Sequence, residues 1–580
     1  MNEKNYFTNP STVTQKKYEA LRAYFVDELP AKQVANKFGY TYRAMTSLIA
    51  DFRKAKKVNP DEELFFQLKF PGRKVMPENN LSASMVIELR KKYLSVPDIK
   101  VILDGKGIVI SEKEIFLIIK REGFGRLPRR TKNQKQKQEV KTILPEKSVE
   151  MNYKGSDIFT SNSVGLLCFW PYIKKYKIDK IITNSSYPET KAISRFASLM
   201  SFLALKLSNV RRYSADDIWC MDRGSGFFSK LNVLPKSAWF SSYSDRVTGE
   251  MNTSFLRSLH DVWITQGLLG DTINLDFTAI PYWGNGEHLE NNWSGKRRQS
   301  MASMLAVLAQ DPDSGIIDYS DTDVLHREHN EVVLTFLDFY KKGNTENDLK
   351  YIVFDSKFTT YQNLSILNQK NVKFITIRRR GKKIMEEINL LPKSNWKRKR
   401  VVCAGNKART LRIYDSIIDL KGYGEKIRQI AITGHGKIKP ALIITNDFEL
   451  KVEEVVRKYS RRWLVEKAIS EQIEFFHLNR VSSSMVIKVD FDLTMTVLAH
   501  NLYRLFAKDL ERYSDNSDNS IYEKFIMNSV EIELKDDLIK VKFKKKKNLP
   551  LLLSVMENFS SEEYWWADNK KLIFEGMTIS

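Results

Sequence analysis

Three acidic residues, far apart in the chain, stand in settings suited to metal-dependent chemistry at a phosphodiester. Asp276 lies in the alternating stretch 272–277, which predicts a strand with the carboxylate on the face opposite the apolar side chains. Asp355 ends the hydrophobic stretch 351–354, and α/β sheets usually place their ligands at that end of a buried strand. The third residue is Glu466. Two divalent cations held by such carboxylates can activate a water or a 3′-hydroxyl and stabilise the leaving oxygen.

Glu466 belongs to a predicted helix that also carries a tyrosine and an arginine. Tyr459, Arg462 and Glu466 follow the i, i+3, i+7 spacing, which places them on one helical face. Each signal is weak alone, because many strands end in an aspartate and an Arg–Glu pair is common on helix surfaces. Taken in chain order, with a basic segment between the second and third acids, they favour a catalytic site over a purely structural role.

The composition points to a polyanionic partner. The chain has 580 residues and a formal net charge of +24, which predicts several domains and attraction to nucleic acid. No apolar run approaches the roughly 20 residues that span a bilayer, so we expect no membrane segment. The three cysteines form neither a disulfide framework nor a zinc pattern, which is typical of a reducing interior. We therefore expect a cytoplasmic, nucleoid-associated protein.

The N-terminal region contains a pattern typical of a helix-turn-helix. In the segment 31–49, a short helix ends at Gly39, which makes the turn, and a second helix begins near Thr41. An ordinary helical hairpin would show a similar sequence pattern. The residues expected to reach DNA from the second helix are Tyr42, Arg43, Thr46 and Ser47.

A second helical DNA-binding domain is predicted over residues 76–130, followed by a basic linker over 131–150. Ser111 opens a helix in this domain, with Glu114 at the capping-box position. Arg129 and Arg130 could lie in a DNA minor groove, where arginines favour narrow, negative sites. A solvated linker is the alternative interpretation of this basic stretch.

Asp276, Asp355 and the Tyr459–Arg462–Glu466 set resemble the DDE catalytic triad of IS4-type bacterial insertion-sequence transposases. The family signature on the third element is Tyr, two residues, Arg, three residues, Glu, and then a lysine seven positions on. In this chain Ile473 takes the place of that lysine, and Lys467 or His477 are candidates to replace its phosphate contact. The resemblance covers roughly residues 150 to 510.

The resemblance implies an α/β fold with an RNase H-like core, in which helices flank a mixed five-stranded sheet. Asp276 would lie on the first strand and Asp355 on the fourth, and Glu466 would project from a helix packed on the sheet. The three carboxylates would bind two Mg²⁺ or Mn²⁺ ions, roughly 3.5–4 Å apart, which hard oxygen ligands suit. Tyr459 and Arg462 would hold the phosphate near the cleaved end.

The same resemblance implies a β-rich insertion between the second aspartate and the glutamate. In relatives this insertion helps to form a DNA hairpin intermediate, with an aromatic side chain holding a flipped base. Trp396 could stack in that way beside the basic residues Lys397 and Arg398, which we expect to contact DNA. A partly buried aromatic anchor is an equally good interpretation of Trp396.

These patterns predict the following organisation of the chain. A helix-turn-helix domain spans 1–75, and the second helical domain and linker follow up to 150. The rest is divided into a helical region over 151–270, the first part of the RNase H-like core over 271–371, the β-rich insertion over 372–446, the second part of the core over 447–515, and a C-terminal basic domain over 516–580.

The predicted function is that of a DNA transposase. It would bind terminal inverted repeats, cut the element out and join it to a target, possibly through the hairpin intermediate. Its partners would be double-stranded DNA, as transposon ends and as target, and a second copy of the chain in the DNA complex. Two alternatives remain: a transposase-derived DNA-binding regulator without catalysis, and a stand-alone RNase H-like DNA nuclease. Only the first alternative would bind DNA without nicking it.

Overall fold

The computed structural model divides the chain into two compact units, residues 1–141 and 142–580, and each is described by itself. The structure describes residues 9–58, 65, 81–92, 94–125, 127, 148–151, 156–162, 164–210, 217–282, 289–294, 299–322, 324–342, 349–402, 408–436, 439–478 and 486–577.

The first unit is helical. Its first three helices are α2 (Val13–Phe25), α3 (Ala31–Phe38) and α4 (Tyr42–Val58), which share one apolar cluster. Its next three are α5 (Leu81–Lys91), α6 (Val96–Gly105) and α7 (Glu112–Arg121), which share another. The predicted capping box of Ser111 and Glu114 is confirmed at the start of α7.

The turn between α3 and α4 lies where the sequence predicted it. Gly39 ends α3 with a φ of +65°, a left-handed conformation that glycine adopts without strain. Val34 and Phe38 of α3 are buried against Met45 of α4. Tyr42 is 59% exposed, so the start of α4 is available to a partner. Arg43 and Ser47 are also exposed on this helix.

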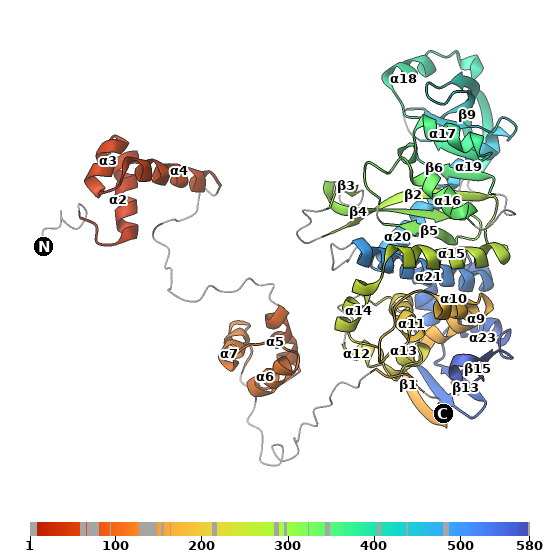
Figure 1. The fold of residues 1–580 in the computed structure, drawn as a ribbon, viewed down its shortest axis with the longest axis horizontal. Coiled ribbons are helices and arrows are strands. Elements are labelled where there is room, and N and C mark those ends of the chain that lie inside the picture. The colour runs from red at the N-terminus through yellow and green to blue at the C-terminus, as the bar shows by residue number, and fades with distance from the viewer. Residues whose placement is uncertain are drawn as a thin grey trace. The chain divides into compact units, whose positions relative to one another are not determined.

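The second unit is built around a ten-stranded mixed sheet in the order β3-β4-β2-β6-β7-β11-β10-β9-β8, with β5 paired to β4 (Figure 1). The strands are β2 (Thr272–Pro281), β3 (Asn291–Ser294), β4 (Gln299–Gln310), β5 (Ile317–Asp321), β6 (Tyr351–Phe354), β7 (Lys373–Ile377), β8 (Lys397–Val402), β9 (Ala408–Asp419), β10 (Lys426–Thr433) and β11 (Ala441–Thr445).

Five neighbouring strands of this sheet carry the predicted aspartates. Within the order β5-β4-β2-β6-β7, the first two pairings are antiparallel and the last two are parallel. In the parallel pair β2–β6, Asn274 lies opposite Val353. Because the two strands run the same way, Asp276 and Asp355, each two residues further on, lie towards the same edge of the sheet.

The segment predicted as a β-rich insertion does not form a separate sheet. Its strand β11 pairs antiparallel with β7, and β10, β9 and β8 follow in turn. Strands β8, β9, β10 and β11 all lie within this segment. The sheet is therefore larger than the five strands that the resemblance implied. Helices α18 (Lys382–Asn389) and α17 (Tyr361–Gln369) lie near this end of the unit in Figure 1.

Two long helices connect this sheet to the rest of the second unit. In Figure 1, α15 (Gly249–Thr265) and α21 (Val486–Asp509) lie between the sheet and a group of shorter helices. That group includes α9 (Trp170–Lys175), α10 (Ile178–Asn184), α11 (Arg195–Leu207), α12 (Asp217–Cys220), α13 (Arg223–Phe228) and α14 (Ser237–Tyr243). One continuous apolar cluster runs through these helices and the sheet, and it fixes the core as a single body.

The C-terminal residues form a second, five-stranded sheet with a strand from the start of the unit. Its order is β1-β12-β13-β15-β14, and its strands are β1 (Asp157–Ser161), β12 (Val530–Leu534), β13 (Leu538–Phe543), β14 (Glu563–Tyr564) and β15 (Lys570–Gly576). Helix α23 (Leu549–Glu557) packs on β15. None of the helices in the described part of the chain combines the length and the apolar character needed to cross a bilayer.

Candidate active site

Asp276 lies in the middle of β2 with a largely buried carboxylate. Its side chain is 14% exposed, and its Oδ1 accepts a hydrogen bond from the Phe277 backbone N–H at 2.8 Å. Burial raises the pKa of Asp276 to about 6, with the Arg462 guanidinium opposing the shift and the charges of Glu466 and Asp355 adding to it. The last two effects show that the three predicted acids share one electrostatic environment.

Arg462 bridges two of these acids across the fold. Its Nη1 donates to Asp276 Oδ2, a partner 186 positions away in the sequence. Its Nη2 donates to Glu466 Oε1 at 2.6 Å. The proximity of these carboxylates raises the pKa of Arg462 against the effect of burial, so the group is charged. The predicted Arg and Glu therefore face the predicted strand aspartate.

The element that carries these residues differs from the single helix that the sequence predicted. Helix α19 (Val452–Arg461) ends and α20 (Trp463–Glu474) begins at Arg462, which serves as the last cap of one and the first cap of the other. The Arg462 N–H bonds to the Tyr459 carbonyl at 3.2 Å, and the Val465 N–H bonds to the Arg462 carbonyl at 3.0 Å. These i to i−3 bonds tighten the helix locally and aim Arg462 at the sheet.

Asp355 stands directly after β6 and caps the short helix η3 (Ser356–Phe358). Its Oδ1 accepts from the Ser356 N–H at 2.5 Å and from the Ser356 hydroxyl at 3.2 Å. Phe358 of this helix stacks on Phe277 of β2, with ring centroids 3.8 Å apart and planes 3° from parallel. The stack attaches the segment after Asp355 to the residue next to Asp276.

Tyr459 lies close to the same charged side chains. Its ring packs against the apolar cluster of β6, β7 and the insertion strands, and the Arg462 guanidinium is 5.9 Å from its centroid. Burial raises the pKa of Tyr459 to about 12, with Arg462 opposing the shift and Asp355 adding to it. Tyr459, Arg462 and Glu466 thus lie together, as the spacing predicted, with Asp355 and Asp276 within their electrostatic reach.

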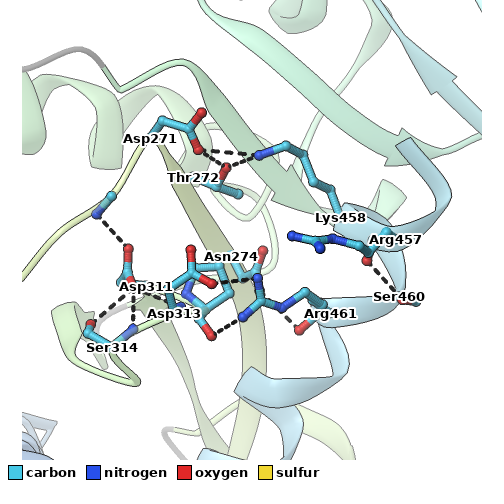
Figure 2. A network of polar contacts seen from close by, with 12 residues as sticks. Asp271, Thr272, Asn274, Asp311, Asp313, Ser314, Arg457, Lys458, Ser460 and Arg461 are labelled. Carbon is cyan, nitrogen blue, oxygen red and sulfur yellow. Dashed lines mark hydrogen bonds and ion pairs between the residues drawn. The ribbon is translucent and has the colours of Figure 1, made fainter. Parts of the chain in front are cut away.

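A polar network that joins α19 to the start of β2 and to the turn between β4 and β5 fixes the position of the junction (Figure 2). Arg461 pairs with Asp313 at 2.6 Å, donates to the Pro312 carbonyl at 2.6 Å, and accepts at its own carbonyl from the Asn274 side chain at 3.1 Å. One turn earlier, Lys458 donates to the Thr272 hydroxyl at 2.5 Å. Arg461 and Arg462 therefore have different partners, and the contacts of Arg461 hold the backbone from which Arg462 reaches the acids.

Within residues 457–462, the sequence pattern predicted a role only for Tyr459 and Arg462. The network around Lys458 and Arg461 was not predicted. A local signal was available, because Lys458 and Arg461 share one helical face at i, i+3 spacing. Their partners come from the start of β2 and from the turn between β4 and β5, which no local pattern connects to them.

A cavity of about 870 Å³ is lined in part by Arg461 and Asp313 of this network, and none of the three acids lines it. Its wall includes Glu471 and His500, which approach the fully buried Asp518; in the described part of the chain these three form the one group of metal-ligating side chains with ligand atoms within 4.8 Å of one another. Asp518 is already paired with His500 Nδ1 at 2.6 Å and with Arg504 Nη2 at 2.7 Å. The group is therefore a buried ion-pair network, which joins α20, α21 and α22 (Asp518–Ile521).

The remaining predicted contacts are distributed as follows. Trp396 is half-buried against the insertion strands, with its ring 6.2 Å from that of Tyr414, and Lys397 and Arg398 are exposed beside it. Arg129 and Arg130 lie outside the described residues. Ile473 packs on the apolar core.

The two proposed replacements for the family lysine have other partners. Lys467 approaches Glu471 at 3.9 Å on the cavity side of α20. His477 Nε2 lies 3.2 Å from the Asn209 carbonyl oxygen. In these positions neither side chain faces the acids.

Among solved structures, the chain is similar to the piggyBac transposase in the cryo-EM structure of its synaptic complex with hairpin DNA, with 12% identity and a TM-score of 0.32, over 66% of this chain and 84% of that one. No curated protein matches the sequence. Residues 270–502 match the family model described as the transposase DDE domain, and this region contains Asp276, Asp355 and Glu466. The family match therefore supports a DDE transposase.

Proposed function

We propose that this protein is a DNA transposase of the IS4 type whose catalytic acids are Asp276, Asp355 and Glu466. The observation that carries the proposal is the Arg462 bridge, which brings Glu466 to Asp276 at the sheet edge where Asp355 ends its strand. Such a group of carboxylates with a flanking arginine and tyrosine has the donor set of a phosphoryl-transfer site. The strand order β5-β4-β2-β6-β7 supports an RNase H-like core, with Asp276 on its first strand and Asp355 on its fourth.

The carboxylate donors fit Mg²⁺ or Mn²⁺, which prefer hard oxygen ligands. Bound there, two such ions would lower the pKa of the attacking water or hydroxyl and neutralise the departing oxygen. The chain's own residues would orient the substrate. Arg462 would pair with a phosphate oxygen through its guanidinium, and the Tyr459 hydroxyl, whose pKa of about 12 keeps it protonated, would donate a hydrogen bond.

The N-terminal helices supply the proposed sequence-reading module. α3 and α4 have the arrangement of a helix-turn-helix, and Tyr42, Arg43 and Ser47 are exposed near the start of α4. We propose that α4 enters the major groove of the terminal inverted repeats, with Thr46 adding a contact. Because two ends must be joined, we propose a homodimer in the DNA complex. A hairpin intermediate with Trp396 stacking on a flipped base, and DNA contacts from Lys397, Arg398, Arg129 and Arg130, belong to the same proposal.

The proposal is tested with the full-length protein and a duplex that carries the imperfect inverted repeats from the DNA flanking the gene. We expect strand cleavage at the repeat boundary with Mg²⁺ or Mn²⁺, none with EDTA, and joining of the new 3′-hydroxyl to a target duplex. Cleavage without joining would instead identify a nuclease. Binding that never produces a nick under any divalent metal would overturn the enzymatic proposal in favour of a DNA-binding regulator.

The raised pKa of Asp276 predicts a pH dependence for metal binding. Because the carboxyl is protonated below about pH 6, a metal must displace its proton there. We expect the apparent Mn²⁺ affinity to fall about tenfold for each pH unit below 6 and to level off above 7. Electron paramagnetic resonance titration of free Mn²⁺ measures this directly. An affinity that is constant between pH 5 and 8 would exclude Asp276 as a ligand.

A further inference from the structure

Arg462 lies in the position that a cation bound between Asp276 and Glu466 would need. One terminal nitrogen of its guanidinium meets a carboxylate oxygen of Asp276, and the other meets Glu466 Oε1 at 2.6 Å. The Arg462 side chain is only 15% exposed, so water screens these contacts poorly. A guanidinium and a divalent ion cannot occupy the same space between these oxygens.

The bridge leaves part of the guanidinium unsatisfied. The Nε of Arg462 is buried and has no hydrogen-bond partner among the described residues. Its two terminal nitrogens serve a pair of acids whose environment also includes the charge of Asp355. The single positive charge of Arg462 therefore offsets the charges of several carboxylates. A divalent cation carries more charge and would compete with Arg462 for these carboxylates.

The backbone around Arg462 allows its side chain to move alone. Arg461 is tied to Asp313 and Pro312, which Arg462 does not contact, and Asn274 holds the Arg461 carbonyl (Figure 2). The junction of α19 and α20 thus stays in place when the Arg462 side chain rotates. Rotation about its side-chain bonds would carry the guanidinium from the carboxylates towards a substrate beside them.

We infer that Arg462 is an internal counter-ion that holds Asp276 and Glu466 together until a divalent metal replaces it, and that the released guanidinium then binds the DNA phosphate. This inference rests on the proposed function and adds a mechanism of coupling to it. Metal favours the free guanidinium, and a phosphate that captures the guanidinium favours metal binding. By linkage, metal and DNA bind with positive cooperativity through this one side chain.

The test measures Mn²⁺ affinity of the full-length protein by electron paramagnetic resonance, with and without a pre-cleaved end duplex. The duplex carries a 3′-deoxy terminus, so it offers phosphates but no attacking hydroxyl. For the unsubstituted protein we expect DNA to tighten Mn²⁺ binding about tenfold, within the range usual for linked sites. For Arg462→Gln and Arg462→Ala we expect Mn²⁺ binding that is about tenfold tighter without DNA and that no longer responds to DNA.

Two variants serve as matched controls. Arg462→Lys keeps the positive charge, so its Mn²⁺ affinity without DNA should stay closer to that of the unsubstituted protein than to that of Arg462→Gln. Arg457→Ala removes another guanidinium of α19, one that pairs with Glu454 at 3.4 Å, and should change Mn²⁺ affinity less than about twofold, because Glu454 is not one of the site acids. Circular dichroism verifies that each variant is folded, and the glutamine variant retains an amide donor in case alanine does not fold.

The outcomes separate this inference from the function on which it rests. One outcome is that the unsubstituted protein binds no Mn²⁺, or binds it no better than Asp276→Asn does. In that case the metal site of the proposed function fails, and the counter-ion inference fails with it. If that binding is present but Arg462→Gln binds Mn²⁺ equally or more weakly without DNA, the metal site stands and the counter-ion inference alone is overturned. Retention of the DNA response in Arg462→Gln would likewise overturn the coupling.

Discussion

Replacing Asp276 by asparagine is expected to abolish metal-dependent cleavage while leaving DNA binding nearly unchanged. Asparagine keeps the size of the side chain, but its neutral amide is a poor ligand for a hard divalent cation. The Asp276 carboxylate pairs with Arg462, and the charge of Asp355 acts on its pKa. Its replacement therefore removes a proposed metal ligand and not a peripheral surface charge. Loss of several kcal/mol of transition-state stabilisation corresponds to a rate decrease of about 10³-fold or more.

The measurement is the single-turnover cleavage rate of an end-bearing duplex, together with the dissociation constant of the same duplex. Asp355→Asn and Glu466→Gln should show the same pattern. Asp313→Asn is the matched control, since Asp313 is 70% exposed and pairs with Arg461 on the other side of the helix junction. Its cleavage rate should stay within about threefold of the unsubstituted value. A rate for Asp276→Asn within tenfold of that value would refute the assignment of Asp276.

The parts of the site that sequence could predict are those with a local signal. The apolar run that ends at Asp355 predicts a buried central strand, and β6 ends at Phe354 as expected. The alternation around Asp276 predicts a strand with the carboxylate on the face opposite the apolar side chains, and the structure confirms the strand over Thr272–Pro281. The helical spacing of Tyr459 and Glu466 predicted that they lie near Arg462, which the structure also shows.

The parts that it could not predict depend on partners distant in sequence. A periodic pattern gives no register, so the antiparallel joining of the insertion strand β11 to β7 was not foreseeable. The break at Arg462 has no glycine or proline to signal it. The break follows from two contacts with different elements: Arg461 pairs with a residue in the turn after β4, and Arg462 pairs with a residue of β2. Tertiary contacts thus override a helical pattern that is continuous in sequence.

The largest effect on stability is expected at a site that sequence reasoning did not single out. Asp518 is fully buried and contacts His500 Nδ1 at 2.6 Å and the Arg504 guanidinium through Nε at 3.1 Å and Nη2 at 2.7 Å. Asp518→Asn would leave these donors without a counter-charge in the interior. Breaking a buried pair in this way costs about 3–5 kcal/mol in the free energy of unfolding.

The pH dependence of this effect gives a second, independent check. The charges of His500 and Arg504, and their hydrogen bonds, lower the pKa of Asp518 below its usual value of 3.8 against the opposing effect of burial. A group whose pKa is depressed by folding adds stability above its unfolded pKa and loses that contribution as the pH falls through its folded pKa. The contribution of the Asp518 carboxylate to the difference in unfolding free energy between the unsubstituted protein and Asp518→Asn should therefore shrink as the pH falls below about 4.

Urea unfolding of the full chain at pH 7, 5 and 3.5, followed by tryptophan fluorescence, measures this difference. Asp515→Asn is the control, because Asp515 is exposed and lies three residues earlier; we expect its effect to stay within about 0.5 kcal/mol. If Asp518→Asn also lowers the free energy of unfolding by only about 0.5 kcal/mol, the pairing of Asp518 with His500 and Arg504 contributes little to stability. Because Glu471 on α20 faces the same network, Asp518→Asn should also loosen the helix that carries Glu466, which connects this buried anchor to the position of the third acid.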